Sequence, residues 1–307
     1  SLEKYNKKLG ASDTSGPTED LVFLSQARSV QISTNSVSSV IPSFFSLNVV
    51  NLSYQPGLRL RNSAMGYIRD KINKIPYAER LIGTKTVQHP ILHNINFCAR
   101  GGKITAILGT AEERRDLTEI IIGRKKRGTV SGNIFLKGSF LPNTNSYYEN
   151  VSYVPLRPIF VPGLTYAELL RYSVRLKMSN YNHSPKFVED RLEDLLTIMD
   201  LQRCKDRKIP DRPQTRGELG CDFRRLVIAL EIATLPNLIV INEPTLDFDP
   251  AISVSIMQCL KTLTSRGHAV VCSFSHPYKQ ELLQIDTIVL ISEGYSIYSA
   301  SPRYVEK

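Results

Sequence analysis

Three short apolar runs, each followed by polar residues, constrain the fold of this chain more than any other feature of its sequence. They are residues 104–108 (ITAIL), 238–241 (LIVI) and 269–274 (AVVCSF). A run that is apolar along its whole length is typical of a strand buried on both faces of a parallel sheet. Polar residues at the carboxyl ends of such strands mark the edge where α/β proteins place their sites. The runs therefore predict an α/β core with a site at that edge.

Helical patterns separate these runs and gather in the middle of the chain. Thr165 and Glu168 have the spacing of a capping box at the start of one amphipathic helix. A Ser-Pro pair starts a second helix over residues 184–201, and residues 224–235 predict a third. The second helix is expected to bury one face, made of Phe187, Val188, Leu192, Leu195, Leu196 and Met199.

Further strand patterns lie mostly before the helical region. Residues 44–54 (FFSLNVVNLSY) alternate as a strand does, and residues 91–109 predict a hairpin whose turn holds Gly101 and Gly102. Other segments predicted to contribute strands are residues 128–138, 150–155 and 285–301, the last as a strand or a hairpin.

The sequence divides into a tail and one main domain. Residues 1–40 are rich in Ser and Thr and predict a mobile tail, whereas residues 41–307 carry the periodic patterns. Within the main domain, residues 55–89 form a basic insertion, and residues from about 157 to 235 form a helical subdomain.

The composition of the chain indicates which classes of protein and partner are compatible with it. The formal net charge of +10 favours a partner of negative potential, such as nucleic acid, an anionic membrane surface or an acidic protein. The five cysteines are scattered, without metal-ligand spacing, as in a reduced intracellular protein. No run approaches the about 18 apolar residues that a membrane span needs. The opening SLEKY lacks an initiator Met, as an excised piece of a longer protein would.

The segment AILGTAEERRDL, residues 106–117, has two interpretations. An apolar strand, a glycine and a following helix form the geometry that holds phosphate on backbone N–H groups. The same letters also describe an ordinary polar helix start that Thr110 caps, with acidic residues first and basic residues later. The residues of the segment alone leave both interpretations open.

Five landmarks in order identify the family. They are AILG…IIIGR, SYVPLRPIFVPGLTYAELLRYSVRL, RGELGCDFRRLVIALEI, LIVINEPTLDFDP and SFSHP. From about residue 45 to residue 301 the sequence resembles the nucleotide-binding domain of ABC transporters of the G subfamily. The basic insertion is similar to that of the sterol-exporting half-transporters called sterolins. The resemblance implies a P-loop-type parallel-sheet core, an antiparallel β subdomain and an inserted helical subdomain.

The resemblance also assigns a role to each site position. The phosphate loop of the family needs glycines, a lysine and a hydroxyl, but this chain has a loop one residue shorter, with Glu112, Glu113 and Arg114 where glycines are usual. Candidate loop residues are Gly109, Thr110, Arg114, Arg115 and Asp116, with the lysine role falling on Arg114 or Arg115. Other positions are Leu156 (Q-loop), Leu219 and Gly220 (signature, for the partner's site), Asn242 (Walker B), Asp249 (D-loop), Ser275 and His276 (switch region), and Glu243, the retained general base.

The resemblance implies a half-transporter, and the departures at its site positions predict impaired catalysis. They also predict weak binding of ATP and magnesium, no metal site of its own and no cofactor needed for the structure. The resemblance also implies a membrane domain outside this chain, a second half-transporter as hetero- or homodimer partner, a lipid or sterol as substrate, and a place on the cytoplasmic face of a membrane. The alternatives are a slow but active ATPase that uses Glu243, and a basic module that binds lipid or nucleic acid through residues 55–89 and 123–128; nucleic acid is the less favoured partner.

Overall fold

The computed structural model describes residues 45–56, 90–125, 128–136, 139–140, 150–158, 160–178, 184–213 and 216–302. The predicted tail at residues 1–40 and nearly all of the predicted basic insertion lie outside the described residues. The domain boundaries proposed above therefore stay predictions.

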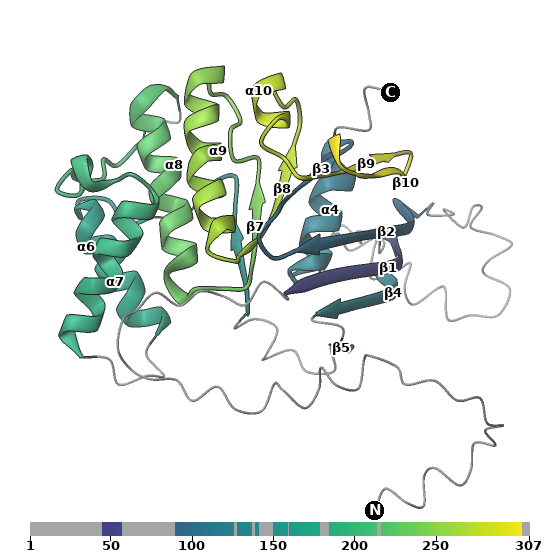
Figure 1. The fold of residues 1–307 in the computed structure, drawn as a ribbon, viewed down its shortest axis with the longest axis horizontal. Coiled ribbons are helices and arrows are strands. Elements are labelled where there is room, and N and C mark those ends of the chain that lie inside the picture. Colours follow the sequence, from purple (N-terminus) through teal and green to yellow (C-terminus); the bar gives the residue numbers. More distant parts are fainter. Residues whose placement is uncertain are drawn as a thin grey trace, which may run out of the picture. The chain divides into compact units, whose positions relative to one another are not determined.

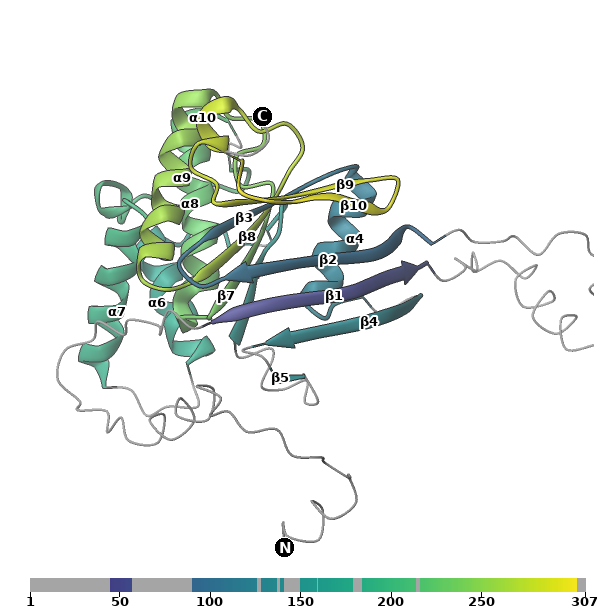
Figure 2. The ribbon, with the colours of Figure 1, turned by 45° about the vertical axis from the view of Figure 1, so that its right-hand side comes forward.

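The described strands form one 10-stranded mixed sheet with the order β5-β4-β1-β2-β10-β9-β3-β8-β7-β6. Its strands are β1 (Ser46–Gln55), β2 (Leu92–Arg100), β3 (Ile104–Leu108), β4 (Thr129–Leu136), β5 (Ser139–Phe140), β6 (Val151–Val154), β7 (Leu238–Asn242), β8 (Ala269–Phe274), β9 (Thr287–Ser292) and β10 (Tyr295–Ala300). Strands β6, β7, β8, β3 and β9 pair in parallel, whereas β1 pairs antiparallel with β2 and β4 (Figure 1, Figure 2). The predicted parallel core and antiparallel strands are both present.

The predicted hairpin at residues 91–109 is wrong. Its two strands form as β2 and β3, but β10 and β9 lie between them in the sheet. The chain does turn at Gly101, where an added Cβ would lie 2.9 Å from the carbonyl oxygen of Gly267. A turn signal reports that the chain reverses, whereas the neighbours of β3 are set by its parallel pairing with β8 and β9. The hairpin at residues 285–301 does form, as β9 and β10.

Six described α-helices accompany the sheet. They are α4 (Ala111–Ile121), α6 (Tyr166–Lys177), α7 (Pro185–Ile198), α8 (Gly217–Glu231), α9 (Pro250–Ser265) and the short α10 (Lys279–Leu282). Helix α6 has the predicted capping box, and α7 starts at the predicted Ser-Pro pair. Helix α8 starts earlier than the predicted residue 224. The predicted face of α7 is buried except for the half-buried Phe187, and it also buries Arg191, whose Nη2 donates to the carbonyl of Ile232 at 2.9 Å.

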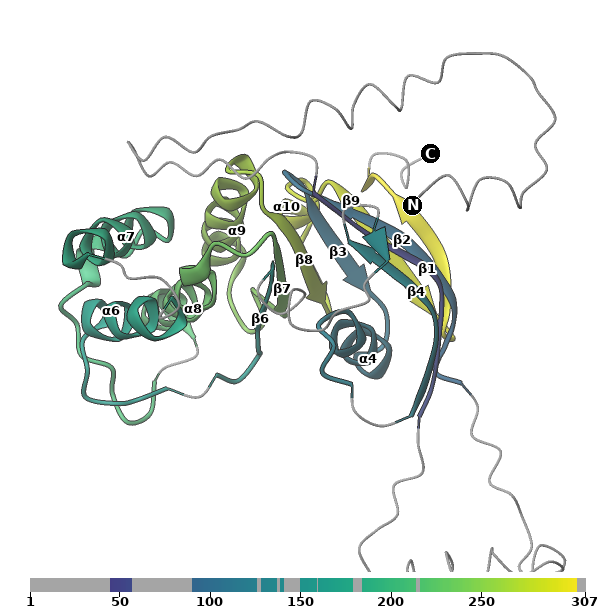
Figure 3. The ribbon, with the colours of Figure 1, turned by 90° about the horizontal axis from the view of Figure 1, so that it is seen from below.

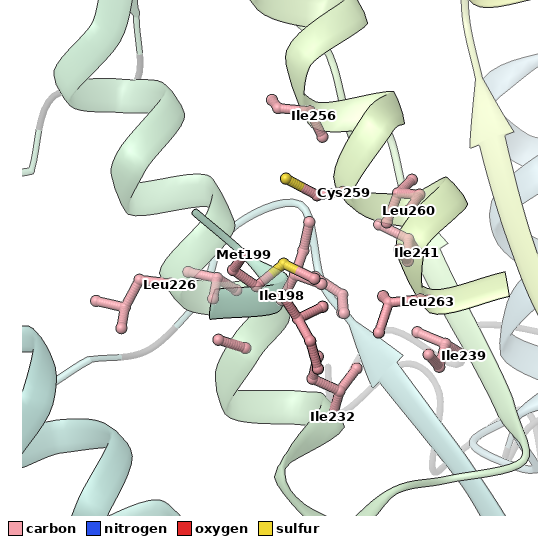
Figure 4. Close-up of a cluster of buried hydrophobic side chains, with 14 of the residues drawn as sticks. Ile198, Met199, Leu226, Ile232, Ile239, Ile241, Ile256, Cys259, Leu260 and Leu263 are labelled. Carbon is pink, nitrogen blue, oxygen red and sulfur yellow. The ribbon is translucent and has the colours of Figure 1, made fainter. Parts of the chain in front are cut away.

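The two faces of the sheet bury different sets of side chains. On β7, Ile239 and Ile241 pack among the residues of α6 to α9, whereas Leu238 and Val240 pack with α4 and the antiparallel strands. Figure 3 shows α4 on one face of β3 and β8 and α9 on the other. Figure 4 shows side chains of α9 directed toward those of β7. Because β7 and β8 are covered on both faces, packing positions their carboxyl ends at one edge of the sheet.

Candidate functional site

The carboxyl ends of three neighbouring parallel strands meet at one edge of the sheet. In the order β3-β8-β7, Gly109 follows β3, Ser275 follows β8 and Glu243 directly follows β7. Parallel neighbours end on the same side, so these three segments approach one another. Hydrogen bonds join them through the Arg114 side chain.

The link between β3 and α4 consists of two residues, Gly109 and Thr110. Thr110 Oγ1 accepts from the backbone N of Glu113 at 3.4 Å, and the Glu113 carboxylate accepts from the backbone N of Thr110 at 2.8 Å. This reciprocal pair is a capping box. At Gly109 a Cβ would lie 2.9 Å from the carbonyl oxygen of Ile291, so the strand and the loop can approach this closely only with glycine. The capped helix start is therefore the local structure of this segment.

The Glu113 carboxylate lies against the backbone donors of the loop. Its Oε2 accepts from the N and Oγ1 of Thr110, both at 2.8 Å, and its Oε1 accepts from the backbone N of Gly294 at 2.6 Å. Burial favours the neutral acid, but the hydrogen bonds from Thr110 and Gly294 and the nearby Arg114 more than offset this, so the pKa of Glu113 is lowered. An internal anion thus occupies the N-terminus of α4.

Arg114 connects all three strand ends. Its Nη1 donates to the carbonyl of Gly109 at 2.6 Å, and its Nη2 donates to Glu243 Oε1 at 2.6 Å and to Ser275 Oγ at 2.8 Å. Ser275 in turn donates to Glu243 from its backbone N at 2.9 Å and from its Oγ at 2.5 Å. The Arg114 and Glu243 side chains are 9% and 8% exposed, so the ion pair is nearly shielded from water. Glu243 has φ of +50°, an uncommon conformation for a residue other than glycine, and such backbones persist where surrounding contacts hold them.

Asp116 has partners outside this network. Its carboxylate is buried and lies 2.5 Å from Nζ of Lys125, which follows α4. The Lys125 ammonium also lies 4.8 Å from the ring centroid of Tyr54. Burial lowers the pKa of Lys125, but the hydrogen bonds to Asp116 and Glu119 outweigh it and raise the pKa. The exposed Arg115 lies 3.7 Å from Asp116, and it is Arg114 whose guanidinium group bonds to the strand ends.

Asn242, the last residue of β7, is held by its neighbours. Its side-chain Oδ1 accepts from Ser273 Oγ at 2.7 Å, and its carbonyl accepts from Nη2 of Arg224 at 2.6 Å. Arg224 lies on α8 and also donates to the carbonyl of Pro155 at 2.7 Å. Helix α8 is thereby joined to the end of β7 and to the segment that follows β6.

Comparison with known proteins places the chain in a family. No protein family model matches it. ABC transporter G family member 13 from Arabidopsis thaliana is 29% identical over 212 residues, which cover 68% of this chain and 30% of that protein. The ABC transporter ATP-binding protein/permease wht-1 from Caenorhabditis elegans is 30% identical over 211 residues, covering 68% of this chain and 31% of that protein. ABC transporter G family member 1 from Dictyostelium discoideum is 29% identical over 215 residues, covering 70% and 27%. This chain is a G-family ABC domain.

A solved structure agrees with this family at the level of the fold. The protein described as "Structure of ATP binding subunit of ABC transporter" superposes with a TM-score of 0.57 at 21% identity, covering 85% of this chain and 91% of that one. The predicted family and fold class are therefore confirmed. The chain spans about 30% of the length of the curated relatives it matches. None of the described helices has the length and apolar character needed to cross a bilayer.

The G-family ABC domain joins some of the predicted site residues in one network and leaves others outside that network. Gly109, Thr110, Arg114, Glu243 and Ser275 belong to one hydrogen-bonded network, which Thr110 joins by accepting from the backbone N of Arg114. Five other predicted positions lie outside this network. Asp249 caps α9 by accepting from Ile252 N at 2.9 Å, and His276 is exposed. Leu156 and Leu219 are 38% and 44% exposed, whereas Gly220 is buried.

Three contributors to the site were not assigned from the sequence. Glu113 could have been found, because Thr110 and Glu113 have capping-box spacing. Lys125 and Arg224 carry no such local signal. Their partners, Asp116 and the carbonyls of Pro155 and Asn242, are supplied by the folded chain.

Proposed function

We propose that this domain is the nucleotide-binding-domain part of a G-family ABC half-transporter, and that it supports ATP-coupled lipid or sterol export as a catalytically impaired partner in a dimer. The observation that carries the proposal is the network of Arg114, Glu243 and Ser275. These residues stand at the family's lysine, general-base and switch positions, and they bind one another. Because these side chains already bond to one another, few of their donors and acceptors are available to a nucleotide.

The phosphate loop supports this proposal. A phosphate-binding loop presents unpaired N–H groups and a free cation to its ligand. Here the Glu113 carboxylate accepts from Thr110 and Gly294, and the Arg114 guanidinium already has three acceptors. A carboxylate about 4 Å from a phosphate charge costs about 4 kcal/mol at an effective dielectric constant of about 20. A triphosphate would have to displace Glu113 as well as Arg114.

The residues present do not fit a magnesium ion either. Asn242 contributes a neutral amide where the family has a carboxylate, and its Oδ1 already accepts from Ser273. Asp116 is engaged with Lys125. Among the described residues no group of three or more His, Cys, Asp or Glu side chains could hold a metal ion. We therefore assign no step to magnesium at this site.

The transporter role rests on the relatives. Their names describe ABC transporters and an ATP-binding protein/permease, and each is about three times as long as the matched region. We propose that a membrane domain outside the matched region and a second half-transporter complete the assembly, with this domain on the cytoplasmic face. ATP chemistry then belongs to the partner, and this domain completes the dimer and transmits motion to the membrane part. The lipid or sterol substrate follows from the likeness to sterolins.

Equilibrium binding of a fluorescent ATP analogue, with and without magnesium, tests the proposal. We expect no saturable binding up to millimolar nucleotide. Micromolar, magnesium-dependent binding would refute it, because it would require that Glu113 and Arg114 release their partners readily.

A slow ATPase is the second candidate, and the observation that favours it is the retained carboxylate of Glu243. Turnover that the Glu243→Gln variant abolishes would support this candidate. Turnover equal in the variant and the parent would exclude it. Circular dichroism of the variant serves as the control for folding, because Glu243 also holds Ser275 and Arg114.

A further inference from the structure

We propose that a pocket beside the strand-end network binds a short amphiphilic carboxylate. The pocket has a volume of about 200 Å³ and is formed by the segment after β6, one side of α8 and the turn after β7. Its lining includes Leu156, Glu243 and Gly220, but its chemistry differs from that of the network. The proposed ligand does not depend on nucleotide.

Most of the pocket wall is apolar. The apolar side chains that line it are Leu156, Pro158, Phe223, Val227, Leu246 and Phe248. Leu156 and Leu246 are 38% and 37% exposed, so they leave apolar surface at the pocket in contact with water. The ring of Phe223 also packs edge-to-face against that of Phe160, with the ring centroids 5.4 Å apart. Since an apolar cavity of about 150 Å³ can hold benzene, this volume suits a tail of about five or six carbons.

The charged side chains that line the pocket differ in whether they form ion pairs. Of the two carboxylates in the lining, Glu243 forms a buried ion pair with Arg114 at 2.6 Å, whereas the exposed Asp247 makes only a long contact of 3.9 Å with Arg216. The two lining arginines are Arg157 and Arg224. Neither forms an ion pair with any carboxylate in the part of the chain that the structure describes. The lining thus carries two arginines and two carboxylates, and among the described residues neither arginine has an ion-pair partner.

Among the described residues, Arg224 is a buried cation that forms no ion pair, although the Glu243 carboxylate lies near enough to favour its charged form. Only 7% of the residue is exposed, and its Nη atoms donate to the carbonyls of Pro155 and Asn242. Among the described residues its Nε has no hydrogen-bond partner. Burial lowers the pKa of Arg224 to about 10, so the side chain is still charged at neutral pH. A buried charge that is satisfied only by neutral groups is costly, and an anion in the adjoining pocket would compensate it.

These features define the chemistry of the ligand. The carboxylate would lie toward Arg157 and Arg224, and the tail would cover Leu156 and Leu246. Arg157 is exposed and can adjust to the head group, whereas Arg224 is fixed by its carbonyl contacts. Hexanoate has the required head group and tail length.

Isothermal titration of the 307-residue chain with hexanoate, 1-hexanol and hexylamine tests the proposal. We expect one saturable hexanoate site, with affinity about tenfold above that for 1-hexanol because charge-assisted contacts are stronger. Hexylamine should not bind. Absent hexanoate binding, or equal affinities for hexanoate and hexanol, would overturn the proposal.

Two variants locate the site. Arg157→Gln should weaken hexanoate binding about tenfold, because it removes one of the two lining arginines proposed to hold the carboxylate. Arg124→Gln is the matched control, since Arg124 lines a different cavity, and it should bind hexanoate as the parent does. Equal losses in both variants, or no loss in Arg157→Gln, would contradict the assignment. None of these outcomes bears on nucleotide binding, so this proposal and the proposed function can fail separately.

Discussion

Replacing Arg114 by Met should destabilise the domain by about 3–5 kcal/mol, the usual result of removing one partner of a buried ion pair. The two charged atoms lie 2.6 Å apart, and both side chains are more than nine-tenths shielded. At an effective dielectric constant of about 20, the Coulomb attraction at this distance is about 6 kcal/mol, and part of its loss is offset because Met does not incur the cost of burying a charge. Glu243 would keep only the two hydrogen bonds from Ser275.

Urea unfolding followed by circular dichroism measures this change. Arg115→Met is the matched control on the same helix, because Arg115 is 53% exposed and its nearest carboxylate oxygen is 3.7 Å away. Its cost should stay within about 0.5 kcal/mol. The double variant Arg114→Met with Glu243→Gln should lose less stability than the sum of the single variants, by about 1–3 kcal/mol. A loss below about 1 kcal/mol for Arg114→Met, or one equal to that of Arg115→Met, would refute the reasoning.

Three further predictions concern other groups. The pKa of Glu113 is lowered in the folded state, so its carboxylate stabilises the fold at pH values above the ordinary pKa of 4.5, and this stability is lost as the pH falls through the folded-state pKa. Glu113→Gln should therefore cost about 1–3 kcal/mol of unfolding free energy at pH 7 and progressively less as the pH is lowered, measured by unfolding curves at each pH. Burial raises the pKa of the Cys272 thiol, so mass spectrometry after iodoacetamide treatment at pH 8 should find Cys98 modified before Cys272; equal rates without denaturant would contradict the buried position. Asp249→Ala should lower stability by about 1 kcal/mol in urea unfolding through loss of the cap on Ile252, and an unchanged midpoint would mean that the cap contributes nothing.

The parts of the fold that sequence alone determined are those that depend on near neighbours. The caps at Thr110, Thr165 and Ser184 each join residues three positions apart, so their patterns are visible in the chain itself. The apolar runs that became β7 and β8 were recognisable because strands buried on both faces need apolar side chains throughout. The family resemblance rests on the order of such local features.

Tertiary structure alone decided which segments became neighbours. The turn after β2 was visible in the sequence, but β10 and β9 come from the end of the chain and separate β2 from β3. Arg114 bonds to Glu243, which is 129 positions away in the sequence, and to Ser275, which is 161 positions away. Glu113 bonds to Gly294, which is 181 positions away. Sequence could name Arg114 as a candidate for the lysine role without showing whether its guanidinium group was free. The order of parallel strands brings Glu243 and Ser275 within reach of it, and long-range pairing of this kind leaves no periodic signal along the chain.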